Sequence, residues 1–93
     1  MKYRKKPVVI EAFKYEGDFI DRYGKRIVPD WAFQSFLEGI LFYGEEQSWE
    51  LYVKTLEGNM HVNLDDYVIK GVKGEIYSCK PDIFEMTYEK LED

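Results

Sequence analysis

The pattern that most restricts the fold of this chain is a pair of strand-like runs on either side of Lys73-Gly74. Both runs are rich in β-branched and aromatic residues, and a glycine-containing bend between two such runs is typical of a β-hairpin. Asp65-Asp66 precedes the first run as a turn, and Pro81 follows the second run and opens a helical turn. We therefore predict a turn, a strand, a bend, a second strand and a helical turn over residues 65–85.

One segment, from Pro29 to about Glu38, has the periodicity of an α-helix. Pro29 suits the first helical position because its missing N–H would be unpaired there, and Gly39 is a natural stop. The apolar face of this segment consists of Phe33, Phe36, Leu37 and Ile40, widened by Trp31 and Ala32. A helix this short is stable only when it packs on other elements, so we predict that Phe36 or Leu37 belongs to the core.

Short alternating runs fill most of the remaining sequence. Strand-like runs outside the hairpin cover residues 8–15, 40–43, 49–56, 60–64 and 86–91. In the first of them Val8–Ile10 is continuously apolar, as expected for a strand covered on both faces. The length of 93 residues fits one domain spanning residues 1–93. We predict an α+β fold, with a small curled or barrel-like antiparallel sheet of five to six strands and one packed α-helix.

The net charge of −5 hides an asymmetry along the chain. Residues 1–26 carry eight Lys/Arg and four Asp/Glu, whereas residues 27–93 carry five and fourteen. An acidic domain is repelled by phosphate backbones, so general nucleic-acid binding is not expected, although the basic tract suits an acidic partner or the chain's own acidic half. No apolar run is long enough for a membrane span, and the run after Pro7 is broken at Glu11, too early for a signal peptide. Because Cys79 is the only cysteine, we expect no internal disulfide and a cytoplasmic protein.

The chemically versatile side chains do not form a recognisable catalytic or metal motif. His61 is the only histidine and is expected on the outer face of its strand with Asn63, so we interpret it as a surface residue rather than a ligand. Cys79 is interpreted as an inert thiol, with a reactive thiolate beside the turn at Pro81-Asp82 as the alternative. Asp65-Asp66 falls far short of a calcium loop, and Asp66 is expected to bond local backbone. We therefore expect no enzyme, no metal and no cofactor.

The acidic half of the chain contains one group of basic and aromatic residues. Its members, all on or next to the predicted hairpin, are Tyr67, Lys70, Lys73, Tyr77 and Lys80. Such a face can bind a nucleotide by stacking and charge. The interpretation that we favour is a solvated hairpin face on which the lysine stems cover the tyrosine rings.

Three segments, Met1–Ala12, Val28–Trp31 and above all Asp66–Glu85, resemble a family of small bacteriophage and prophage proteins of Gram-positive bacteria. The resemblance extends over nearly the whole chain and is weakest over residues 16–27 and 43–50. It implies no particular catalytic or binding residue.

What the resemblance implies is a context, an accessory phage protein in the cytoplasm of a bacterial host. Such a protein is expected to act without catalysis, by stoichiometric binding of a host component, as a modulator of host defence or replication. The partner is then a host protein or a small anionic ligand. The alternatives are a protein that sequesters a nucleotide or another small molecule, an acidic mimic of nucleic acid, and a degenerate hydrolase.

Overall fold

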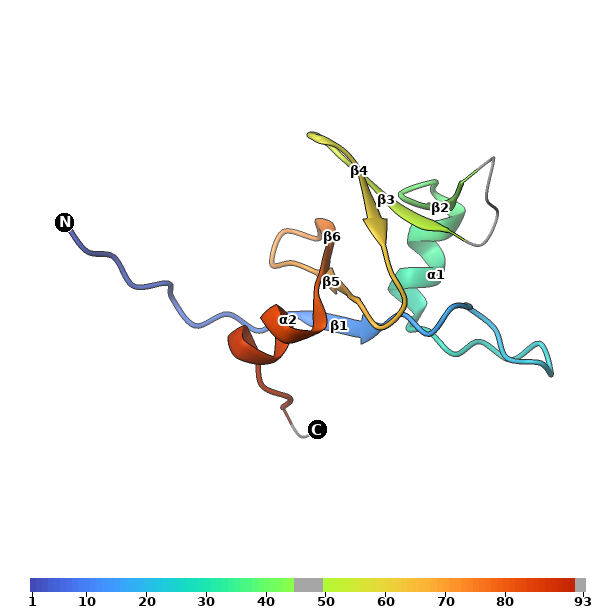
Figure 1. The fold of residues 1–93 in the computed structure, drawn as a ribbon, viewed down its shortest axis with the longest axis horizontal. Coiled ribbons are helices and arrows are strands. Elements are labelled where there is room, and N and C mark those ends of the chain that lie inside the picture. Colours follow the sequence, from blue (N-terminus) through green and yellow to red (C-terminus); the bar gives the residue numbers. More distant parts are fainter. Residues whose placement is uncertain (45–49, 92–93) are drawn as a thin grey trace.

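The structure is a computed structural model that describes residues 1–44 and 50–91, and these ranges form two helices and six strands (Figure 1). In chain order they are β1 (Glu11–Lys14), α1 (Asp30–Leu37), β2 (Leu41–Tyr43), β3 (Leu51–Thr55), β4 (Gly58–Val62), β5 (Tyr67–Lys70), β6 (Ile76–Cys79) and α2 (Pro81–Thr87). The α+β class, the helix that follows Pro29 and the hairpin around Lys73-Gly74 are confirmed. Trp49, expected to start a strand, lies outside the described residues.

The described strands form two antiparallel sheets of three strands each, with the orders β1-β5-β6 and β2-β3-β4. The prediction of a single curled or barrel-like sheet with one helix was therefore wrong in its details. The chain leaves one sheet for the other after β4, so β5 pairs with β1 and not with β4.

A strand was also predicted over residues 86–91, and this was wrong. Met86 and Thr87 belong to α2, and the rest of that run forms no strand within the described part of the chain. Phe84 and Tyr88 both contact the β1-β5-β6 sheet. They are four residues apart, which is the spacing of one face of a helix and not the alternation of a strand.

The main core lies where the inner faces of the two sheets and helix α1 meet. Its buried members are Tyr15, Phe19, Val28, Ala32, Leu41, Leu51, Val53, Val62 and Val68. Helix α1 contributes Ala32 and Ser35 as its buried residues, whereas Phe36 is 36% and Leu37 65% exposed. The prediction that Phe36 or Leu37 would be buried was wrong, because the small Ala32 makes the close contact and Phe36 packs at the rim of the core.

Helix α2 covers the other face of the β1-β5-β6 sheet and creates a second apolar layer. The ring of Phe84 stacks on that of Tyr67 at 3.8 Å between centroids, and the hydroxyls of Tyr77 and Tyr88 lie 3.4 Å apart. Val68 and Ile69 are neighbours in β5 and point to opposite faces, yet both are fully buried. This sheet is therefore covered on both sides.

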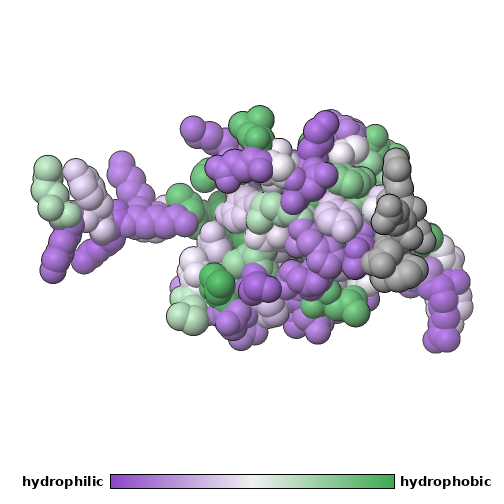
Figure 2. All heavy atoms as spheres, turned by 45° about the horizontal axis from the view of Figure 1, so that its top comes forward, coloured by the Kyte–Doolittle hydropathy of each residue, from purple (hydrophilic) through white to green (hydrophobic). Residues whose placement is uncertain are grey.

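Residues 1–10, the N-terminal arm, extend away from the body of the molecule (Figure 1). Val9 is 72% exposed and the strand begins only at Glu11, so the prediction of a two-sided buried strand over Val8–Ile10 was wrong. In Figure 2 the arm is mostly hydrophilic, and hydrophobic residues on the visible face of the body appear as separate spots.

A β-bulge at Asp65-Asp66 joins the two sheets. The N–H of Asp65 donates to the carbonyl of Tyr15 at 2.9 Å, and the N–H of Tyr15 donates to the carbonyl of Asp66 at 2.8 Å. Two residues thus oppose one, and Asp65 has the positive φ of 72° that glycine usually provides at this position. The carboxylate of Asp66 accepts the N–H of Asn63 at 2.9 Å, which confirms that Asp66 bonds local backbone. The bulge turns the chain from β4 into β5 and positions the site described next.

No helix among the described residues has the length and apolar character needed to cross a membrane.

Candidate functional site

A groove of about 460 Å³ lies between β4, β6 and the start of α2, and we call it the β4–β6 groove. It is lined by Met60, His61, Asn63, Asp66, Ser78, Cys79, Lys80 and Ile83. Most of these side chains are polar, with Met60 and Ile83 as apolar exceptions. Ligand sites commonly have volumes of roughly 300–1,000 Å³, so the groove has the size of a small-molecule site.

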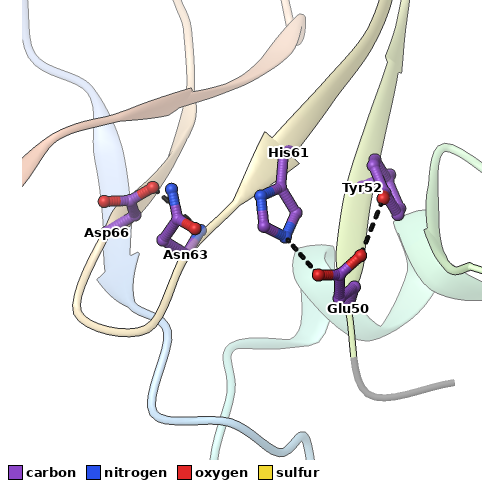
Figure 3. A network of polar contacts seen from close by, with 5 residues as sticks. All are labelled: Glu50, Tyr52, His61, Asn63 and Asp66. Atoms are coloured by element: carbon purple, nitrogen blue, oxygen red, sulfur yellow. Dashed lines mark hydrogen bonds and ion pairs between the residues drawn. The ribbon is translucent and has the colours of Figure 1, made fainter. Parts of the chain in front are cut away.

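The β4 wall of the groove belongs to a row of polar side chains (Figure 3). His61 lies between the Asn63–Asp66 pair and Glu50, whose carboxylate is 3.9 Å from the imidazole Nε2. The other oxygen of Glu50 accepts the hydroxyl of Tyr52 at 3.0 Å. Glu50 therefore contacts two neighbouring side chains. It meets the imidazole on the side that faces away from the β-bulge at Asp65-Asp66.

The imidazole is also supported by rings on the adjacent strands. Phe42, Tyr52 and His61 are paired across β2, β3 and β4, so their side chains point to the same face of the sheet. Tyr52 stacks on Phe42 at 5.6 Å and lies 5.1 Å from the His61 ring. As predicted, His61 is on the outer face of its strand, and this ring ladder orients it.

On the β6 wall, Cys79 has a thiol that resists ionisation. Burial raises the pKa of Cys79, and the nearby negative charges of Asp66 and Asp82 raise it further. Its Sγ donates to the carbonyl of Lys80 at 3.6 Å. A thiol with a raised pKa is a poor nucleophile at neutral pH, which argues against the reactive thiolate considered from the sequence.

The structure divides the five residues of the basic and aromatic group among four locations. Tyr67 and Tyr77 lie on the α2 side of the sheet, where burial and the Tyr88 hydroxyl raise the pKa of Tyr77 to about 12. Lys70 pairs in register with Ile76, so it points to the opposite face, with its Nζ 3.9 Å from the Glu11 carboxylate. Lys73 lies in the exposed turn of the hairpin, and Lys80 alone lines the groove.

Sequence reasoning did not group His61, Asn63, Asp66, Ser78 and Cys79 into one site. His61 and Cys79 were considered singly because they are far apart in sequence, and they meet only because β4 of one sheet contacts β6 of the other. The turn signal at Asp65-Asp66 was the available indication, since the residues on both sides of a turn lie close in space.

His61, Asp66 and Cys79 all line the groove, but the described residues contain no group of three or more His, Cys, Asp or Glu placed to hold a metal ion. Comparison of the chain with protein-family models, with curated proteins and with solved structures gave no match in any of the three.

Proposed function

We propose that the protein acts without catalysis, by stoichiometric binding of a host component, and that the β4–β6 groove takes a small anionic ligand of the nucleotide class. The observation that carries this proposal is a groove of small-molecule size that combines a lysine, a carboxylate and apolar side chains. Lys80 suits a phosphate, Asp66 accepts a donor such as an exocyclic amine, and Met60 and Ile83 suit the face of a base.

Binding fits the groove better than turnover does. The thiol of Cys79 has a raised pKa and is protonated at neutral pH. The single imidazole, that of His61, is oriented toward Glu50, the residue just before β3. Nucleophilic catalysis requires a nucleophile activated by an adjacent base, and a protonated, partly buried thiol is suited to lining a site instead.

The resemblance to small phage and prophage proteins supports the biological setting of the proposal. In that setting the protein works in the cytoplasm of the bacterial host, and removal of a nucleotide from solution modulates host defence or replication. The acidic-mimic alternative has less support, because Glu11, Asp30 and Glu50 each lie beside a basic side chain or histidine.

The test is titration with a panel of mononucleotides and dinucleotides, followed by calorimetry and by amide NMR signals. We expect one ligand per chain and signal changes at His61, Asn63 and Lys80. A matched pair of variants, Lys80→Ala and Lys73→Ala, removes the same charge from the groove and from the hairpin turn. Because a charge-assisted hydrogen bond contributes about 1.5–3 kcal/mol, Lys80→Ala should weaken binding by roughly 10- to 100-fold, and Lys73→Ala should leave it unchanged.

Three results would contradict the proposal. Loss of binding in Lys73→Ala but not Lys80→Ala would place the site at the hairpin turn. Signal changes confined to residues 17–26 would place it in the loop before α1. Multiple turnover of a substrate that Cys79→Ser abolishes would identify an enzyme.

A further inference from the structure

The N-terminal arm carries charge opposite to that of the rest of the chain. Residues 1–10 contain four Lys/Arg and no Asp/Glu, which leaves nine Lys/Arg and eighteen Asp/Glu in residues 11–93. The arm reaches the body at Lys5, whose ammonium lies 5.7 Å from the centre of the Tyr88 ring. Its apolar residues Val8 and Val9 are exposed. The arm thus combines cations with exposed β-branched residues.

The arm leads directly into β1, a strand that ends the sheet order β1-β5-β6. Tyr15 uses both its N–H and its C=O to bond the bulge beside β5. The backbone N–H and C=O groups alternate sides along an antiparallel strand. Those of Glu11 and Phe13 therefore also point to β5, whereas those of Ala12 and Lys14 point to the open edge. Unpaired edge groups of this kind are a template for another strand.

Besides Glu11 within β1, three acidic residues follow the strand immediately. They are Glu16, Asp18 and Asp21, and the first two are exposed. If another strand paired antiparallel with β1 at this edge, the residues that precede that strand in its own chain would lie beside this acidic segment. In a second copy of this chain, the preceding segment is the arm, with Arg4, Lys5 and Lys6.

We propose that two copies of the chain associate by antiparallel pairing of their β1 strands, which places the arm of each copy along the Glu16–Asp21 segment of the other. Pairing about Ala12 joins the β1-β5-β6 sheets of the two copies into one six-stranded sheet. This register sets Glu11 opposite Phe13 and Lys14 opposite Ile10 of the second copy, so like charges do not meet. Pro7 lies an odd number of residues from Ala12, so its missing N–H falls on the side away from the second copy.

Charge selects the second copy over nucleic acid as the occupant of this edge. A nucleic acid would be attracted by the four cations of the arm but repelled by the acidic remainder of the chain. It would also leave Val8 and Val9 without apolar contact. The acidic segment of a second copy neutralises the cations, and an added strand covers the apolar residues.

The first experiment measures the oligomeric state by analytical ultracentrifugation over a range of concentrations at low and high salt. We expect a dimer whose dissociation constant rises with salt. The triple variant Arg4→Glu, Lys5→Glu, Lys6→Glu should raise this constant by about tenfold or more, because three attractive contacts on each side become repulsive. The matched control Lys54→Glu, Lys73→Glu, Lys90→Glu has the same net charge and should dimerise like the original chain.

The second experiment tests the register by cross-linking. In a Cys79→Ser background, Ala12→Cys places two cysteines opposite each other at about 5.5 Å between Cα atoms, a spacing that a disulfide bridges. We expect a rapid interchain disulfide, and little from Asn59→Cys on the exposed part of β4. A monomer at every concentration, equal cross-linking at both positions, or loss of the dimer in the charge control would overturn the proposal. Binding of oligonucleotides through the arm without dimerisation would overturn it as well.

Discussion

Asp65 and Asp66 are chemically identical neighbours, but the bulge gives them different roles. Asp65 is exposed and takes the left-handed backbone conformation, with φ of 72°. Asp66 is 5% exposed, and its carboxylate holds the N–H of Asn63 at the edge of the groove. One residue therefore bears a conformational cost, and the other contributes a hydrogen bond.

These roles predict opposite effects on stability. Asp65→Gly should leave the free energy of unfolding unchanged or raise it by about 0.5–1 kcal/mol, because glycine takes a positive φ without steric cost. Asp66→Ala should lower it by about 1–3 kcal/mol, because the N–H of Asn63 loses its acceptor. Urea unfolding of both variants measures the difference. A loss in Asp65→Gly as large as that in Asp66→Ala would show that the bulge does not depend on backbone conformation.

Cys79 gives a prediction at the same scale. Its raised pKa lowers the fraction of thiolate in the folded protein at a given pH. We expect a thiol-specific reagent at pH 8 to react more slowly with the folded protein than with the protein in urea. As pH is raised, the reaction rate should begin to increase at a higher pH in the folded protein than in the unfolded protein. Equal rates in the two states would mean that the surroundings of Cys79 do not disfavour the thiolate.

At the scale of elements, α1 was predicted correctly as a helix, but its buried face was predicted wrongly. The apolar stripe through Phe36 and Leu37 has helical spacing, but Ala32 and Ser35 are the buried residues. The hydroxyl of Ser35 is satisfied by the carbonyl of Trp31 at 2.8 Å, which removes the cost of burying it. A small pair of residues lets the helix approach the core closely.

Substitutions on the two faces of α1 should therefore differ in effect. Leu37→Ala should change the free energy of unfolding by less than about 1 kcal/mol, because the side chain is largely exposed. Ala32→Leu should cost about 1–3 kcal/mol, since the site has no room for the added carbons. Thermal or urea unfolding gives both values. A greater loss in Leu37→Ala would mean that the stripe predicted from the sequence is the packed face after all.

The contact of α2 with its sheet makes stability dependent on alkaline pH. The pKa of Tyr77 is raised from 10.0 to about 12 by burial and by the Tyr88 hydroxyl. A pKa raised on folding gives stability that is complete below pH 10 and is lost as pH rises toward 12. We expect the melting temperature to fall over this window, and to fall less in Tyr77→Phe. The fall should persist in part, because burial raises the pKa of Tyr15 as well. An identical pH profile in Tyr77→Phe would exclude this contribution.

The elements that could be predicted from sequence are those that local chemistry specifies. Gly74, with its positive φ, marks the hairpin bend, and Pro29 marks the start of α1. The two-sheet arrangement was not predictable in this way, because it depends on pairing between residues as distant as Lys14 and Tyr67. The groove shares this origin, so of its lining residues only Lys80 was among those predicted to bind.

For the whole molecule, the β1-β5-β6 sheet is a shared wall between two apolar layers. Val68 faces the main core and Ile69 faces α2, and each layer includes part of the aromatic content of the chain. Charge is unevenly distributed along the chain, because the N-terminal arm is basic and the remaining residues are acidic overall. The periodicity of the sequence indicates which residues alternate, but it does not indicate how many layers they build.

The distance in sequence between β1 and β5 sets an order of events during translation. The strands of the β2-β3-β4 sheet are consecutive in sequence and can pair as soon as they leave the ribosome, whereas β1 waits for β5, its partner in the sheet. Until then Ala12 and Phe13 are available to chaperones. Lys80 and Ile83 emerge later still. In a nascent chain the strands of the β2-β3-β4 sheet are therefore complete before the β4–β6 groove is, because the groove also needs Lys80 and Ile83.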